Sequence, residues 1–402
     1  MSVSSAPSDA RPDSFASNSQ GPGFPRVALY ALGGAYFVLG CSSLGAVGMV
    51  EQMQLGLGVS AAAVASLVTV FSLVYAVTAP IAQAVAGHLK RRMAIAGGLC
   101  AIAGGCVLSA LAPSYELLIA ARLIMGLGAA MTGPFLTAAA ATLVAPQDRA
   151  RALSTVFAGV TASSVLGVPL ASFLAQEMGW RWAWGALGAA ALVFACVVWL
   201  LLPAGNKGAR ASLKTLAAVL RNRTLALTIA ALGGSIIAQF STFALIAVWM
   251  ARAGGVSAEM IPPALFLFGV GGIAGNALAA PATRYLGGRG AAMASMTFCL
   301  AAMLALPLAA GSEIAVLAVM TIWSGAGMMV MVPVQSLLVQ LDPERASLTL
   351  ALNSSAVYLG MAVGATVAGA SLGLLGAAAM PLVSAGLMVC ALGVLAISKP
   401  RA

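Results

Sequence analysis

Charged residues are so sparse in this chain that they divide it into long uncharged segments. The 402 residues include only 20 Lys and Arg and 10 Asp and Glu. Most of the apolar segments between them reach the roughly 20 residues that a helix needs to cross the hydrocarbon core of a bilayer. A water-soluble domain could not solvate such a surface. The spacing therefore predicts an all-α polytopic membrane protein, because the strands of a membrane barrel would alternate apolar and polar residues.

Twelve membrane-spanning helices fit between the charges. We expect them over residues 26–50, 60–87, 93–112, 115–143, 153–176, 182–202, 224–251, 260–283, 290–311, 314–341, 348–372 and 377–398. The last two share one charge-free stretch that is too long for a single span. Gly373 and Gly376 mark the expected turn between them.

The basic residues fall on one side of these spans. The connections after even-numbered spans and the two termini hold 17 of the 20 Lys and Arg, whereas the other connections hold only Arg181 and Arg252. An excess of Lys and Arg in short loops marks the cytoplasmic side. We therefore expect both termini in the cytoplasm. The net charge of +10 is thus a topology signal and does not predict binding to nucleic acid, because the basic residues are dispersed over short loops.

The chain is expected to divide into a disordered cytoplasmic tail over residues 1–25, a six-helix bundle over 26–203, a basic cytoplasmic linker over 204–223 and a second six-helix bundle over 224–402. The two halves echo each other. Gly126 and Gly128 in span four have counterparts in Gly325 and Gly327 in span ten. Two parallel six-span repeats that are pseudo-symmetric around a central cavity are a common design of secondary transporters.

The cysteines do not predict a metal site or disulfides. All six lie inside spans, and the only histidine is His88. We interpret the cysteines as small apolar packing residues, and we expect neither a metal nor a cofactor.

Three segments resemble the major facilitator superfamily, and within it the drug:proton antiporters of the arabinose-efflux-permease type. Span four contains Arg122-Leu-Ile-Met-Gly126-Leu-Gly128, which matches the family's Arg-x-x-x-Gly-x-Gly. Span five contains Gly167-Val-Pro169, which is similar to the family's antiporter signature. The loop after span two, residues 83–92, aligns with the family's basic loop but has Gly87 in place of its Asp. The resemblance covers nearly the whole chain after residue 26.

The resemblance implies that spans one, four, seven and ten line a substrate cavity. Arg122 is the one charge well inside a span, where Arg is costly unless it faces a cavity or a partner. The alternatives are a structural hydrogen bond to backbone carbonyls or an outward-reaching side chain. The candidate cavity residues are Arg122, Met125, Ser42, Ser43, Gln239, Trp323 and Gln335, with Asn353 from span eleven. For each of them, interhelical packing is the competing interpretation.

Gly167 and Pro169 break the backbone ladder of span five, and in relatives this segment is associated with export. The alternative is a packing kink. The resemblance also suggests a cytoplasmic gate, for which the competing interpretation is topology alone. The candidate gate residues are Lys90, Arg91, Arg92, Asp148, Arg149, Arg284 and Arg345. We expect Trp180, Trp182 and Trp184 to form an interfacial belt.

The sequence therefore predicts a bacterial inner-membrane transporter, not an enzyme, that exports small amphipathic molecules by alternating access. Its expected partners are the lipid bilayer, a small-molecule substrate and protons, and we expect a monomer. Proton coupling rests on the resemblance, because no acidic residue lies in the middle of a span. Import or facilitated diffusion of a metabolite is the alternative, and a non-transporting scaffold or sensor is a further one.

Overall fold

A computed structural model describes residues 25–145, 148–203, 221–342 and 346–398. Every regular element in this described part is helical, and eleven stretches are long and apolar enough to cross a membrane. One stretch, Ala258–Ala309, has 52 residues, and its backbone leaves the helical conformation at Gly287, where φ is 70°. Counted on both sides of this break, the helices confirm the expected twelve spans.

The first six spans begin near Arg26 and end near Leu201. The first span bends at a 3-10 turn, and the fifth bends at a π turn. Their elements are α1 (Arg26–Leu44), η1 (Gly45–Met49), α2 (Val50–Leu57), α3 (Ala61–Ala86), α4 (Arg91–Ala110), α5 (Tyr115–Thr142), α6 (Arg149–Ala162), η3 (Ser163–Gly167), α7 (Val168–Glu177) and α8 (Trp180–Leu201).

The last six spans follow the same plan, with an irregular seventh span. Their elements are α10 (Arg223–Phe243), α11 (Ile246–Trp249), η4 (Met250–Gly254), η5 (Ala258–Met260), α12 (Ile261–Ala309), α13 (Glu313–Met329), α14 (Met331–Leu341), α15 (Ala346–Leu375), η6 (Ala377–Ala379) and α16 (Met380–Ile397). Residues 1–24 of the expected tail and residues 204–220 of the expected linker lie outside the described residues.

Local chemistry sets the ends of several helices. The Ser60 hydroxyl accepts a hydrogen bond from the backbone N–H of Ala63, and the Asn222 side chain caps α10 in the same way. Between α15 and η6 the chain turns at Gly376, whose φ of 83° favours glycine, whereas Gly373 remains inside α15. The structure thus narrows the expected turn to the second of the two glycines.

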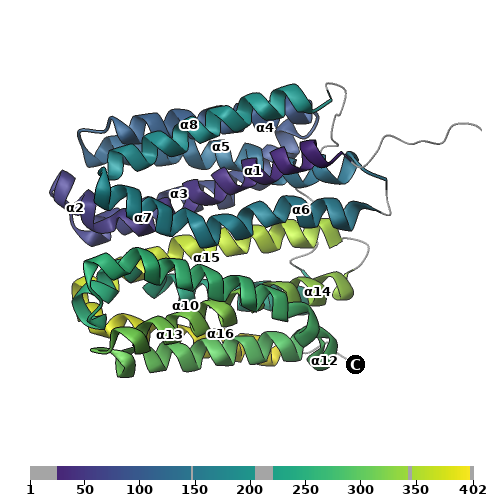
Figure 1. Cartoon of the computed structure of the whole chain (residues 1–402). Helices are drawn as coiled ribbons and strands as arrows, with labels where there is room; N and C mark the ends of the chain where they lie inside the picture. Colours follow the sequence, from purple (N-terminus) through teal and green to yellow (C-terminus); the bar gives the residue numbers. More distant parts are fainter. Residues whose placement is uncertain (1–24, 146–147, 204–220, 343–345, 399–402) are drawn as a thin grey trace, which may run out of the picture.

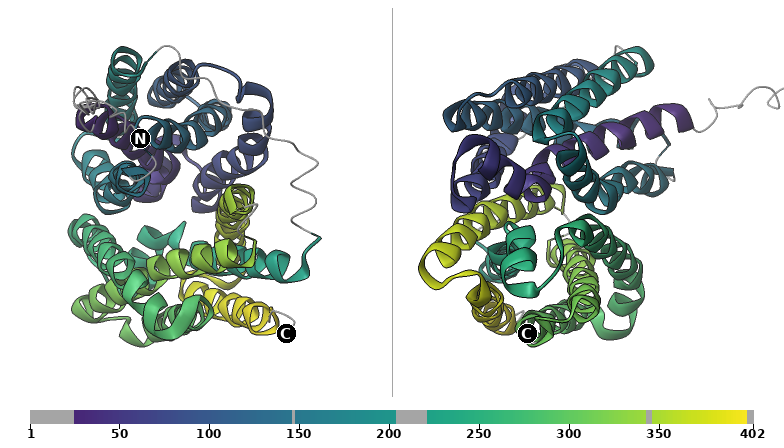
Figure 2. Two further views of the ribbon diagram at one scale, coloured as in Figure 1. Left: turned by 90° about the vertical axis from the view of Figure 1, so that its right-hand side faces the viewer. Right: turned by 60° about the vertical axis from the view of Figure 1, so that its left-hand side comes forward.

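The helices gather into two groups (Figure 1). One group holds α1 to α8, and the other holds α10 to α16; the end-on view in Figure 2 shows them as separate rings of helices. Two pairs of spans make most of the contact between the groups: α3 packs on α15, and the α6–η3–α7 span packs on α12. A smaller contact joins α11 to the η1–α2 end of the first span.

The described hydrogen bonds between the groups lie toward one end of the spans. The Thr69 hydroxyl lies 3.2 Å from both the carbonyl of Ala362 and the hydroxyl of Thr366. Gln176 donates from Nε2 to the carbonyl of Ala258, 3.2 Å away. These residues belong to the halves of their spans that lie away from Arg26, where the described chain begins. The hydrogen bonds therefore hold the two groups together on the side of the spans remote from Arg26, and the ring contact of Tyr75 with Tyr358 extends the junction to about mid-span.

Candidate functional site

Arg122 lies inside the first group of helices and is only 1% exposed. Its guanidinium lies 4.5 Å from the centre of the Trp184 ring on α8 and 5.8 Å from the centre of the Phe71 ring on α3. Nη1 donates to the backbone carbonyl of Ser42 on α1, 2.5 Å away, and Nη2 is buried without a hydrogen-bond partner among the described residues. In this conformation the guanidinium is thus enclosed by α1, α3 and α8, and a role in substrate handling stays a prediction.

The bond to Ser42 has a local cause. Ser42 lies in the last turn of α1, just before the chain changes to the 3-10 turn η1. Carbonyls in the last turn of a helix lack the regular partner four residues on, and a cation is favourable at that end of the helix dipole. Arg122 supplies a donor and a positive charge at this position. This geometry matches the structural alternative that the sequence left open.

Trp184 is a site residue that the sequence did not reveal. The expectation of an interfacial belt is wrong for Trp180 and Trp184, which are 3% and 1% exposed, and it fits only Trp182, which is 64% exposed. A helix turns successive side chains by about 100°, so residues two apart point in widely different directions. The ring of Trp184 therefore faces Arg122 while Trp182 faces outward.

The span-five signature forms a close contact with span one. Gly167 ends the π turn, and a Cβ there would lie 2.6 Å from Cys41 Sγ on α1. Pro169 follows at the start of α7, where its missing N–H cannot continue the α-helical ladder and the wider turn accommodates it. On its other side the π turn meets α12, where a Cβ on Gly269 would overlap Cα of Val165. The signature thus lies at a junction between α1 and the second group.

The paired glycines of spans four and ten perform similar packing. A Cβ on Gly126 would come within 3.0 Å of the Phe71 carbonyl on α3, and Gly325 lies against Gly271 on α12. Gly128 lies against α4, and Gly327 makes room for the amide of Gln239 on α10. Glycine lets each of these helix pairs approach closely, which supports the expected repeat.

A cluster of aromatic and polar side chains lies within the second group. Phe268 on α12 meets Trp323 on α13 edge-on, with ring centres 5.5 Å apart. Trp323 Nε1 and Ser324 Oγ are buried without hydrogen-bond partners in the described part of the chain. Gln239 donates a hydrogen bond from Nε2 to the carbonyl of Ser235, 3.3 Å away, within its own helix. The cluster offers unused donors and acceptors.

Asn353 on α15 is fully buried, and neither atom of its amide has a hydrogen-bond partner among the described residues. A buried amide without partners is costly, so it calls for a water, an ion or a ligand that binds it. Five residues further along α15, Tyr358 stacks on Tyr75 of α3 with ring centres 3.8 Å apart. Asn353 itself lies two helical turns before Gly360, which packs against Gly233 of α10, so its side chain faces the interior of the second group.

The remaining candidate cavity residues are dispersed. Met125 is fully buried against Gly105 of α4, inside the first group. Ser42 Oγ donates to the carbonyl of Leu39 within its own helix, whereas Ser43 Oγ is buried without a partner in the described structure. Gln335 is half-buried on α14. The structure thus places Gln239 beside Gly327, one turn along α13 from Trp323, but leaves Arg122 and Met125 in the other group.

The candidate gate residues make local contacts. Arg91 donates from Nη1 to the Thr142 hydroxyl, 2.9 Å away, and Arg149 donates from Nε to the carbonyl of Ala141. Both contacts join helices of the first group. Arg92 instead lies over the Trp199 ring of α8, 4.6 Å from its centre. The others are Lys90 before α4, Asp148 before α6, and Arg284, exposed on α12; Arg345 lies outside the described residues.

The acidic residues of the described chain all lie at helix ends or between helices. Their positions are Glu51, Glu116, Asp148, Glu177, Glu259, Glu313 and Asp342. Within the described residues, no three His, Cys, Asp or Glu side chains gather closely enough to hold a metal.

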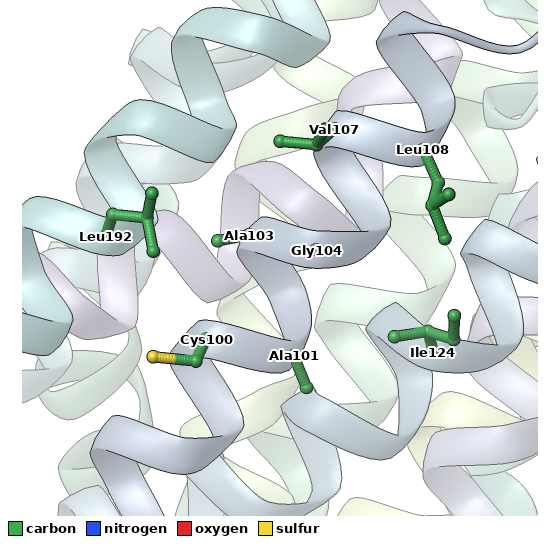
Figure 3. Close-up of a pocket in the computed structure, with 8 residues that line it drawn as sticks. All are labelled: Cys100, Ala101, Ala103, Gly104, Val107, Leu108, Ile124 and Leu192. Atoms are coloured by element: carbon green, nitrogen blue, oxygen red, sulfur yellow. The ribbon is translucent and has the colours of Figure 1, made fainter.

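Two hollows lie on the face of the first group that is remote from the second, and one of them is bordered by Trp199, the ring that Arg92 contacts. The other, of about 450 Å³, is drawn in Figure 3, where Cys100, Gly104 and Val107 of α4 lie between Leu192 of α8 and Ile124 of α5.

A comparison with protein families decides the class of this fold. The model of the Major Facilitator Superfamily matches residues 32–365. The chain belongs to this superfamily. Superfamily members are transporters rather than enzymes, so the chain is a multi-pass integral membrane transporter that contacts lipid and a small-molecule substrate.

Similar proteins support this assignment. The inner membrane transport protein YdhP of Escherichia coli (strain K12) is 28% identical over 351 residues, which cover 85% of this chain and 88% of that protein. A chloramphenicol resistance protein of Streptomyces lividans is 31% identical over 257 residues, or 62% of this chain and 65% of its own length. A crystal structure of a D-xylose-proton symporter superposes with a TM-score of 0.74 at 17% identity, over 94% of this chain and 98% of the symporter. This last likeness concerns the fold alone.

Proposed function

We propose that this protein is a secondary active transporter of the drug-efflux type that exports small amphipathic molecules by alternating access. The observation that supports this most directly is the one-ended junction between the helix groups. Thr69 with Thr366 and Gln176 with Ala258 tie the groups at the end away from the termini. A transporter that is closed at one end can bind its substrate from the other side of the membrane. When the helix groups rock so that the open end closes and the closed end opens, the substrate is released on the opposite side.

The direction of transport is proposed from span five and from a relative. The segment that includes Gly167 and Pro169 lies between α1 and α12, at the junction that must rearrange when the groups rock. The similar Streptomyces protein is named for chloramphenicol resistance, and expelling a drug is one way to resist it. The second point favours export over import.

The substrate class is proposed from buried side chains of the second group. Trp323 Nε1, Ser324 Oγ and the amide of Asn353 are polar atoms that lack partners in the described structure. Phe268 and the ring of Trp323 supply apolar surface next to two of these groups. A mainly apolar site with a few hydrogen-bonding groups suits small amphipathic molecules.

We further propose that transport is coupled to protons. The protein is proposed to work as a monomer in a bacterial inner membrane, with both termini in the cytoplasm. Facilitated diffusion or import of a metabolite is the competing function. One observation favours it: no acidic residue in the described spans lies away from a helix end, although proton carriers are commonly buried Asp, Glu or His.

Uptake into inverted membrane vesicles tests the proposal. Vesicles with the protein should accumulate chloramphenicol or other amphipathic drugs when a proton gradient is imposed, and control vesicles without the protein should not. Collapsing the gradient should release the accumulated drug. Equilibration that is insensitive to the gradient would favour facilitated diffusion. Accumulation only in right-side-out vesicles would reverse the proposed direction.

A further inference from the structure

A continuous apolar groove runs along α4 on the face of the first group that is remote from the second. Its floor consists of the exposed positions of α4, which are Met93, Gly97, Cys100, Gly104 and Val107. Neither glycine has any atom within 4 Å of the place where a Cβ would lie. The floor is therefore low because two of its five residues have no side chain.

Residues of α8 form a wall of this groove. Two hollows of about 450 and 500 Å³ share Cys100 and so join end to end. Leu192 borders the first, and Cys196, Trp199 and Leu200 border the second. Figure 3 shows Cys100 and Leu192 pointing into the same space. From Met93 to Val107 the groove is about 21 Å long at the rise of an α-helix, which exceeds the roughly 15 Å of one leaflet's hydrocarbon.

The end of the groove near the start of α4 is positively charged. The guanidinium of Arg92 lies 4.6 Å from the centre of the Trp199 ring, and its Nε is buried without a hydrogen-bond partner among the described residues. Lys90 and Arg91 precede it, and no acidic residue occurs between Glu51 and Glu116. Arg and Trp at the end of a membrane helix lie at the level of lipid headgroups.

We propose that this groove is a specific binding site for one anionic phospholipid. The headgroup phosphate accepts hydrogen bonds from Arg92 at the rim, and an acyl chain lies along Gly97, Cys100 and Gly104. Charge complementarity selects this occupant, because a purely apolar partner would leave the guanidinium unpaired in the membrane interface. An acyl chain fits a long, shallow, wholly apolar channel better than a rigid helix does. The site is separate from the junction between the helix groups.

Native mass spectrometry of the whole protein in mild detergent tests this site. The probes are phosphatidylglycerol and phosphatidylethanolamine with identical acyl chains. We expect one phosphatidylglycerol to remain bound at concentrations where phosphatidylethanolamine does not. Arg92→Gln should weaken phosphatidylglycerol binding about tenfold, the value of one hydrogen bond to a charged group. Arg223→Gln, at an exposed arginine that starts α10, is the matched charge control and should have no effect.

The groove itself is tested by filling it. Gly97→Leu with Gly104→Leu should weaken phosphatidylglycerol binding without unfolding the protein, because both positions face open space. Gly386→Leu with Gly393→Leu is the control, since these α16 glycines are also seven residues apart, exposed and open. Equal binding of the two lipids, or equal losses in the two double variants, would overturn the proposal. The proposal would also be overturned if the parent protein were a dimer that only the groove-filling variant dissociates. That result would show that a second copy of the chain occupies the groove.

Discussion

The Nη1 atom of Arg122 on α5 donates a hydrogen bond to the backbone carbonyl of Ser42 on α1, across 2.5 Å. The same guanidinium lies over the ring of Trp184. One side chain thus joins three spans of the first helix group at a depth where few other polar contacts are available. We therefore expect the stability of that group to depend on this joint.

Replacing Arg122 by Lys should destabilise the protein by about 2 kcal/mol, the value of a desolvated cation–π contact. Lys keeps the buried charge but lacks the planar group that stacks on Trp184 and reaches Ser42. Thermal unfolding in detergent, followed by tryptophan fluorescence, measures the loss. Arg223→Lys, on an exposed arginine, serves as the control. An unchanged midpoint would contradict the packing role, and a stable variant without transport would indicate direct substrate handling.

Gly167→Ala should cost about 1–3 kcal/mol, because the new methyl group would press on Cys41 Sγ in a closely packed contact. Cys41→Ala removes that sulfur. The double variant should therefore recover most of the loss, as residues in direct contact are not additive. Unfolding midpoints and vesicle transport of the four proteins complete the cycle. Strict additivity would show that Gly167 acts elsewhere than at span one.

A disulfide between Thr69→Cys and Thr366→Cys should lock the junction. The two native hydroxyls are 3.2 Å apart and belong to different helix groups. Oxidation should stop transport because the closed end can no longer open, and a reductant should restore it. The parent protein, with its six cysteines, receives the same treatment as the control. Full transport by the oxidised, cross-linked protein would argue against opening at this end.

Asn353→Leu should separate binding from stability. The native amide is fully buried without partners among the described residues, so a similar-sized apolar side chain should leave the unfolding midpoint unchanged or raise it. Transport should fall if substrate or an ordered water binds the amide. Asn276→Leu on α12, where the side chain is exposed, is the matched control. Normal transport by the Asn353 variant would remove this residue from the site.

Reporter fusions test the orientation of the chain. Green fluorescent protein at the C-terminus should fluoresce, because the basic loops predict a cytoplasmic end. Alkaline phosphatase inserted after Gly311, between α12 and α13, should be active because that connection is expected outside. The opposite pattern at both positions would invert the predicted topology.

The spacing of charges was sufficient to predict where the spans lie. Arg284 and Arg289 flank the break at Gly287, so the sequence predicted two spans where the structure has one interrupted helix. Polar residues are strongly disfavoured in hydrocarbon, and this penalty acts on each segment separately. Boundaries therefore follow from local composition. The paired glycines of spans four and ten likewise indicated the repeat before any helix was placed.

Only the tertiary structure decided which way each helix faces. The side of a span that contacts lipid is as apolar as the side that contacts another helix, so periodicity gives no direction. This is why Trp184 was expected at the membrane interface and lies instead against Arg122. It is also why the sequence did not reveal that Met125 of α5 packs against α4. The contact of Thr69 with Thr366 joins residues 297 positions apart. Such a contact depends on close packing between helices, which composition along the chain does not specify.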